Sequence, residues 1–131
     1  FGLEMIPVKA AGEFFNLRKN ELTATVFGID QSPRNPDRCH WMHFLNQDTG
    51  VLFGAEKFSK EYNYPVLYCT IKKIKRGYYT YHFSLVTDQP QLEQQGEIIE
   101  TATRLLERDI IAIPQYWLWT HKRWKHKRQI R

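Results

Sequence analysis

The chain contains 131 residues, of which 42% are hydrophobic and 15% aromatic. This composition suits a single domain with one ordinary hydrophobic core and excludes an intrinsically disordered chain. No apolar run reaches the roughly 18 residues of a membrane-spanning helix and no signal peptide is apparent, so we expect any membrane contact of these residues to be peripheral. Cys39 and Cys69 form neither a metal-ligand spacing nor a disulfide framework, which favours a reducing compartment.

The positive charge is concentrated at the C-terminus. Residues 1–120 hold all 14 acidic residues and 13 of the 19 lysines and arginines, a net charge of −1, whereas residues 121–131 hold six basic residues and no acidic one. Such a block is typical of a solvated tail. It also suits contact with phosphate on a nucleic acid, an anionic membrane or a phosphorylated partner.

The first part of the chain has the pattern of a βαβ unit. Residues 1–8 approach a short strand, and residues 10–20 have the apolar period of an amphipathic helix. Residues 23–29, Thr-Ala-Thr-Val-Phe-Gly-Ile, form an almost uninterrupted apolar run, which predicts a strand covered on both faces. Because the numbering starts so close to the first strand, we expect the chain to be a piece of a larger protein.

Polar residues follow this apolar run directly. Asp30 and Gln31 open a loop that contains Arg34 and two prolines and extends to residue 39. In open α/β sheets, ligands bind beyond the carboxyl ends of the strands, so these side chains are candidate site residues. The alternative is an ordinary turn, because Asp, Ser, Pro and Asn also build turns for backbone reasons alone.

An antiparallel pair of strands is expected in the middle of the chain. Gly77 lies at a bend between two runs rich in aromatic and β-branched residues, 64–73 and 78–86. The lysines and arginine of residues 72–76 fall on this bend. Charged side chains are common at a sheet edge, where they keep it soluble and prevent pairing with another chain. A further short strand is expected at residues 41–45.

Helices are expected on either side of this pair. Residues 55–62 follow two glycines and form a short helix, and residues 97–113 have the clearest amphipathic stripe in the chain. Pro114 ends that helix. A second C-terminal helix is expected to start at Gln115, within a basic, tryptophan-rich segment of residues 114–131.

The C-terminal segment interleaves three tryptophans with basic side chains. Arginine and lysine bind phosphate, and tryptophan favours the membrane–water interface or a stacked base. The alternative is that the tryptophans belong to the core and the charges to the solvated face of one helix. The tryptophans are Trp117, Trp119 and Trp124.

No common catalytic motif occurs in the sequence. Gly-x-Ser-x-Gly, Cys-x-x-Cys, His-Glu-x-x-His and glycine-rich phosphate loops are all absent, so we expect no metal and no cofactor. His43 precedes Asp48 by five positions, an arrangement in which a carboxylate can orient an imidazole as general base. The alternative is a strand histidine followed by a turn aspartate, since this spacing also arises by chance.

Motifs spread over nearly the whole chain form one ordered pattern. The most specific are Asp30-Gln31 and the Trp-Leu-Trp-x-His-x-Arg-Trp-Lys run of residues 117–125. The pattern resembles the C-terminal half of the lipid A biosynthesis acyltransferases, the lauroyl/myristoyl transferases of the lysophospholipid acyltransferase-like superfamily. The matching positions are 28–33, 41–46, Thr49, Gly54, Glu56, 65–66, Leu106, Glu107, Ile110, Pro114 and 117–125.

The resemblance implies a fold and a reaction. The expected fold is α/β, a mixed sheet flanked by helices that forms the C-terminal part of an acyltransferase fold. The implied reaction moves a fatty acyl chain from an acyl carrier protein thioester to a hydroxyl of a phosphorylated glucosamine lipid precursor. The implied place is the cytoplasmic face of a Gram-negative inner membrane, with peripheral contact to anionic lipid and no nucleic acid. The substrate-binding candidates are Asp30, Gln31, Arg34, His121, Arg123 and Lys125.

The chain also departs from the family pattern. The family's His-x-x-x-x-Asp/Glu motif, its arginine motif and its membrane anchor precede the Asp-Gln loop, and none of the three occurs before Asp30 in this sequence; His43 and Asp48 have the histidine spacing but follow the loop. We therefore expect the chain to be inactive alone and the spacing of His43 and Asp48 to be a coincidence. Two alternatives stay open, a small basic nucleic-acid-binding module and a catalytically silent partner-binding domain. A sheet cut in half is also expected to expose an edge and to form a homodimer.

Overall fold

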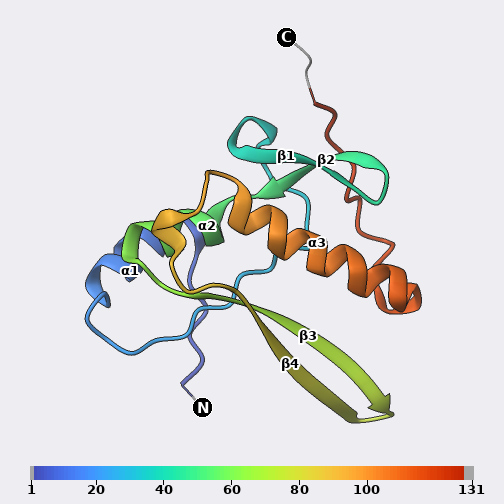
Figure 1. The fold of residues 1–131 in the computed structure, drawn as a ribbon, viewed down its shortest axis with the longest axis horizontal. Helices are drawn as coiled ribbons and strands as arrows, with labels where there is room; N and C mark the ends of the chain where they lie inside the picture. Colours follow the sequence, from blue (N-terminus) through green and yellow to red (C-terminus); the bar gives the residue numbers. More distant parts are fainter. Residues whose placement is uncertain (1, 129–131) are drawn as a thin grey trace.

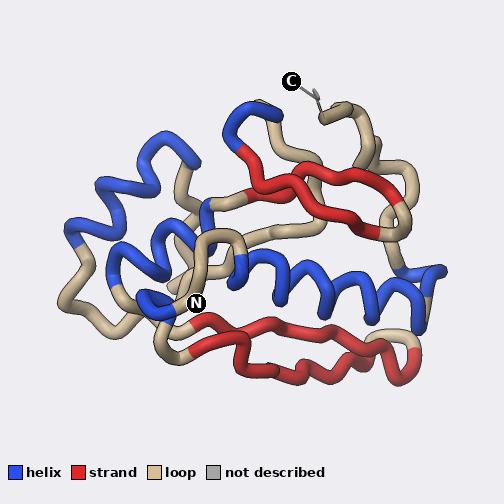
Figure 2. Tube along the Cα trace, turned by 45° about the horizontal axis from the view of Figure 1, so that its top comes forward, coloured by secondary structure: helices blue, strands red, loops and turns tan. Residues whose placement is uncertain are grey.

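The computed structural model describes residues 2–128, in which a long helix lies between two β-hairpins. The helix is α3, Glu97–Ala112. On one side of it lie β1, Cys39–Phe44, and β2, Gln47–Leu52, and on the other β3, Val66–Lys75, and β4, Tyr78–Thr87 (Figures 1 and 2). Each hairpin is antiparallel and pairs only with itself.

Two shorter helices lie at one end of this arrangement. They are α1, Ala11–Leu17, and α2, Gly54–Tyr62. Aromatic side chains of the two helices stack together, with the Phe15 and Phe58 ring centroids 4.4 Å apart, and Phe27 of the irregular segment after α1 stacks on Phe15 with 6.3 Å between centroids. Four short 3-10 turns complete the described elements: Val8–Ala10, Pro36–Arg38, Pro90–Leu92 and Pro114–Tyr116.

The sequence-based expectation of an α/β class is confirmed. The helices expected at residues 10–20, 55–62 and 97–113 and the antiparallel pair around Gly77 all form. Gly77 has a φ of +81°, which a glycine adopts without strain. The sheet itself differs from the expected mixed sheet, because it is divided into two separate antiparallel hairpins.

The strand expected at residues 23–29 is wrong. This segment has no regular structure among the described residues, and the side chains of residues 23–28 are exposed. A strand requires a hydrogen-bonded neighbour, and residues 23–29 pair with neither hairpin, although each two-stranded hairpin leaves its outer edges open. The βαβ unit is therefore wrong as well, and residues 2–8 form no strand; Phe1 lies outside the described residues.

The main core lies under the first hairpin. Met42 and Val51 from β1 and β2 pack with Ile99 of α3, and all three are buried. Ile29 and Phe53 cover the edge of this cluster. The amphipathic stripe of α3 thus meets the β1–β2 hairpin, as its period predicts.

A carboxylate from another helix caps α3. The N-cap residue Gly96 has a φ of +94° and no side chain, and a Cβ atom there would lie 2.5 Å from Cε1 of His40. The fully buried Glu56 of α2 supplies the cap instead, accepting hydrogen bonds from the N–H groups of Gly96 at 2.6 Å and Ile99 at 3.1 Å. Lys60 approaches the same carboxylate at 3.6 Å.

A second carboxylate holds the turn of the first hairpin. Leu45 and Asn46 have φ values of +48° and +59°, the left-handed region that a two-residue hairpin turn requires. Leucine adopts this region at a cost, and Glu107 of α3 offsets it by accepting the Leu45 N–H at 2.5 Å. Burial alone would raise the pKa of Glu107, but the Leu45 N–H and the Arg104 guanidinium outweigh burial and lower that pKa below its ordinary 4.5.

This arrangement predicts an acid-sensitive contribution to stability. Because the pKa of Glu107 is lower in the folded chain, its ionised form stabilises the fold above about pH 4.5 and loses this effect as the pH falls through the folded pKa. Urea unfolding should show Glu107→Gln to be about 1 kcal/mol less stable than wild type at pH 7, with the difference shrinking below pH 4.5. Glu61→Gln, an exposed control, should show no such convergence. A pH-independent difference would contradict the proposed linkage.

Candidate functional site

The structure brings the Asp30 loop and the C-terminal segment together, although about ninety residues separate them in sequence. The Ser32 N–H donates a hydrogen bond to Nε2 of His121 at 3.0 Å. Nε2 of His126 lies 2.9 Å from the carbonyl oxygen of Pro33, which can only accept, so this nitrogen carries the proton. Two histidines, one before and one after Arg123 in the sequence, therefore bind the backbone of the loop.

The C-terminal segment lies along the first hairpin without forming an α-helix. The helix expected from Gln115 is corrected to a single 3-10 turn, Pro114–Tyr116, followed by irregular backbone to residue 128. Its side chains instead bond to the body of the molecule: Trp124 Nε1–H donates to Thr49 Oγ1 at 2.8 Å, and the Trp117 and Phe44 ring centroids are 5.5 Å apart. These partners hold an irregular backbone with turns at residues 119–120 and 123–124 in place of a helix.

Arg123 is the centre of this contact. Its side chain is only 2% exposed, and its Nη1–H donates to the Gly50 carbonyl oxygen at 2.8 Å. Burial lowers the pKa of Arg123, and the nearby Asp30 carboxylate opposes this effect. The guanidinium also lies over the Phe44 ring, 5.7 Å from its centroid. A buried arginine remains charged, so the site holds a cation with little access to water.

Polar atoms at this site lack partners within the described residues. They are Nε and Nη2 of Arg123 and Oγ of Ser32, all buried. Buried polar groups normally find a hydrogen-bond partner, and unpaired guanidinium N–H groups favour an anionic acceptor such as carboxylate or phosphate. The geometry therefore supports an anion-binding function better than a nucleophilic one.

The six substrate-binding candidates divide into two groups. His121 and Arg123 are held by the loop and by β2, whereas the side chains of Asp30, Gln31, Arg34 and Lys125 are exposed around them. Of the exposed members, Asp30 lies close enough to Arg123 to act on its charge. Which of them contact a substrate remains a prediction.

His43 and Asp48 face each other across the first hairpin. They are direct partners in the β1–β2 register, and both side chains are exposed. No hydrogen bond joins their side chains among the described residues. The five-residue spacing is thus the ordinary consequence of a two-residue hairpin turn at Leu45 and Asn46.

Sequence reasoning did not identify Ser32 and His126 as members of this site. Their contacts join backbone to side chain over 89 and 93 residues, and no local pattern reports such a distance. The one sequence signal for these contacts was the concentration of histidine and basic residues in residues 121–126. The sequence-based expectation placed these residues in a helix.

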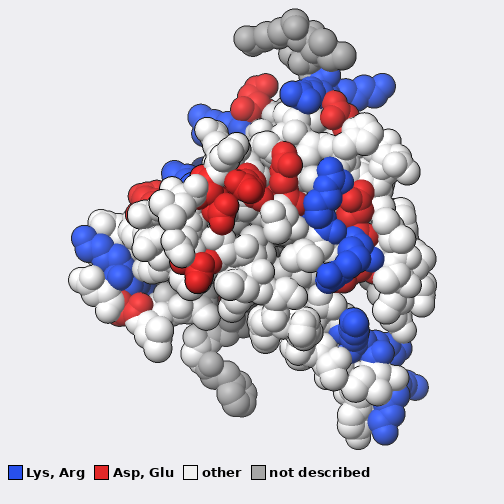
Figure 3. All heavy atoms as spheres, in the orientation of Figure 1, with Lys and Arg blue, Asp and Glu red and all other residues white. Residues whose placement is uncertain are grey.

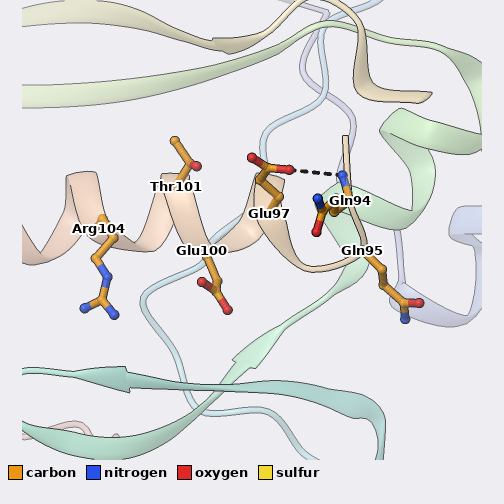
Figure 4. Close-up of a pocket in the computed structure, with 6 residues that line it drawn as sticks. All are labelled: Gln94, Gln95, Glu97, Glu100, Thr101 and Arg104. Carbon is orange, nitrogen blue, oxygen red and sulfur yellow. Dashed lines mark hydrogen bonds between the residues drawn. The ribbon is translucent and has the colours of Figure 1, made fainter. Parts of the chain in front are cut away.

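A hollow of about 460 Å³ lies elsewhere, along the N-terminal half of α3 (Figure 4). Its charged side chains are already engaged within the molecule. Glu97 accepts the Gln94 N–H at 3.0 Å, Glu100 lies 2.6 Å from Nε2 of His40, and Arg104 donates to Glu107 at 2.7 Å. This hollow therefore offers no unpaired charged group for chemistry.

The family of the chain follows from comparison with known proteins. A family model described as bacterial lipid A biosynthesis acyltransferase matches residues 1–126. The chain belongs to this family. Comparisons with curated proteins and with solved structures gave no match.

Membership of the lipid A biosynthesis acyltransferase family sets the general function. The chain has an acyltransferase-type role in lipid A biosynthesis, as its motifs predict. None of the helices in residues 2–128 is long and apolar enough to cross a membrane. The same residues contain no cluster of three or more histidine, cysteine or acidic side chains placed to hold a metal ion.

Proposed function

We propose that the chain is the C-terminal part of an acyltransferase that moves a fatty acyl group from acyl carrier protein to a hydroxyl of a phosphorylated glucosamine lipid A precursor. The family match over residues 1–126 carries this proposal. The buried cation with unpaired N–H groups supports it, because the acceptor is an anionic lipid.

The general base is proposed to come from another part of the complete enzyme. It removes the proton of the acceptor hydroxyl, whose oxygen attacks the thioester carbonyl and releases the carrier thiol. Three of the five histidines support this division of roles, because each is bound within the molecule. His121 and His126 hold the loop backbone, and His40 is bound to Glu100 with its ring against Gly96. The chain alone is accordingly proposed to be inactive.

The residues of this chain would then bind and orient the acceptor. Arg123 offers buried N–H groups to an anionic group, and the exposed Arg34 and Lys125 extend the positive charge outward. Asp30, exposed beside Arg123, would hold a hydroxyl or a basic side chain of the complete enzyme. Acyl carrier protein, which is acidic, is a second proposed partner of the exposed basic residues.

The proposed location is the cytoplasmic face of the inner membrane of a Gram-negative bacterium, where the lipid precursor and acyl carrier protein meet. The basic side chains at the C-terminal end of the described chain lie together at the top of the molecule (Figure 3). Stacking of nucleic-acid bases has less support, since Trp117 packs on Phe44 and Trp124 is bonded to Thr49.

Asp30→Asn tests the role of the loop. In the complete enzyme, we expect this substitution to lower the rate of acyl transfer about tenfold or more, because it removes the charge beside Arg123 without removing bulk. Asp37→Asn, at an exposed position in the same loop, should leave the rate unchanged. Both proteins should melt at the wild-type temperature. An unchanged rate for Asp30→Asn would remove Asp30 from the site.

A further inference from the structure

The β3–β4 hairpin has one face packed on α3 and one face exposed. Tyr68 and Thr70 point inward, where they are buried and donate hydrogen bonds to Asp109 of α3 at 3.1 and 2.7 Å. Because side chains alternate along a strand, their neighbours lie on the opposite face. The register places Leu67 opposite Leu85 and Ile71 opposite Tyr81 on that outer face.

This outer face is apolar and contiguous. Its six large side chains are each 53–62% exposed, and cross-strand partners lie about 5 Å apart, so they form one patch. Monomeric soluble proteins rarely leave so large an apolar patch open to water, which marks it as an interaction surface. The six side chains are Leu67, Ile71, Tyr79, Tyr81, Phe83 and Leu85.

The charge of the hairpin identifies the partner. Residues 66–87 contain four basic residues and no acidic one, and the basic side chains gather at the hairpin tip (Figure 3). They are Lys72, Lys73, Lys75 and Arg76. A second copy stacked on the same face would double this positive charge without supplying an acidic partner. An anionic surface complements both the charge and the patch.

The tip has the composition of a membrane-interface anchor. Lys73 pairs with Tyr79 in the register and its ammonium lies 5.9 Å from the Tyr116 ring centroid, whereas the Lys75 ammonium lies 4.3 Å from the Tyr78 ring centroid. Tyrosines favour the headgroup level, and lysine side chains reach from an apolar surface to lipid phosphates.

We propose that the outer face of the β3–β4 hairpin rests on the surface of an anionic lipid bilayer, with its basic tip at the phosphates. This proposal rests on the lipid substrate of the proposed function and assigns the membrane contact to the hairpin. Arg123, in the C-terminal segment, is buried and does not reach the hairpin face. The reaction site and the membrane contact are then two separate surfaces of one chain.

The native Cys69 provides the test, because it is exposed on the outer face opposite Phe83. In the complete protein with its other cysteines replaced by serine, Cys69 is labelled with an environment-sensitive fluorophore. Vesicles of phosphatidylglycerol and phosphatidylethanolamine should shift its emission to the blue, and brominated acyl chains should quench it. Phosphatidylcholine vesicles should have little effect. This local signal is independent of any other membrane anchor.

Charge variants sharpen the test. Replacing Lys72, Lys73 and Lys75 by glutamine should reduce the fraction of label inserted about tenfold or more. Replacing Lys122, Lys127 and Arg128 by glutamine removes the same charge from exposed positions of the C-terminal segment and should leave the Cys69 signal unchanged.

Other outcomes would overturn the proposal. Blue-shifted emission before vesicles are added would mean that another part of the protein covers the face, and a shift that grows with protein concentration would indicate a second copy. Insertion that is equal on neutral vesicles would remove the role of the basic tip. Failure of insertion in a protein that still transfers acyl groups rejects this inference alone, whereas insertion without acyl transfer rejects the proposed function.

Discussion

Replacing Glu56 by alanine is expected to lower the free energy of unfolding by about 3 kcal/mol. The substitution leaves the N–H groups of Gly96 and Ile99 without acceptors in a fully buried place. It also removes the partner of the Lys60 ammonium. The N-cap residue cannot take over, because it is a glycine whose Cβ position is occupied by the ring of His40.

Thermal unfolding and amide hydrogen exchange measure this effect. We expect the melting temperature to fall by roughly 10 °C and the amides of Gly96 and Ile99 to exchange faster than those in the middle of α3. Glu61→Ala, an exposed position on the same helix, is the matched control and should change stability by less than about 0.5 kcal/mol. If Glu56→Ala behaves like this control, α3 has another cap.

Arg123→Met is expected to separate binding from stability. Methionine has a similar length and no strong hydrogen-bonding atom, so it removes two unpaired buried nitrogens while losing one hydrogen bond to Gly50. We expect the free energy of unfolding to fall by no more than about 1–2 kcal/mol, because removing unpaired buried N–H groups offsets part of the cost of leaving the Gly50 carbonyl without a donor. Arg123→Ala should lose about 3 kcal/mol, because it leaves a cavity beside Phe44.

The same substitution should nevertheless reduce catalysis. In the complete enzyme, Arg123→Met should lower the acyl-transfer rate about 100-fold if the unpaired N–H groups hold the anionic acceptor. Lys122→Met removes an equal charge from the exposed neighbouring position and should have little effect. Wild-type activity in Arg123→Met would show that the arginine only joins the C-terminal segment to β2.

Residues close in sequence determine much of this fold. The stripe of α3, the stop at Pro114 and the glycine bend of the second hairpin are local signals, and each is found in the structure. The motifs Asp30-Gln31 and residues 117–125 likewise indicate the acyltransferase family through residue types and spacing alone, and the family match confirms it.

The tertiary structure alone decides the rest. The apolar run at residues 23–29 reads as a buried strand, yet a strand depends on a neighbour that the local sequence does not specify. The basic segment after Pro114 reads as a helix, yet its side chains are bound to Ser32, Thr49 and Gly50, which lie 73–89 residues away. Periodicity reports which faces of a segment are apolar, whereas the partner that covers each face is chosen by contacts between distant parts of the chain.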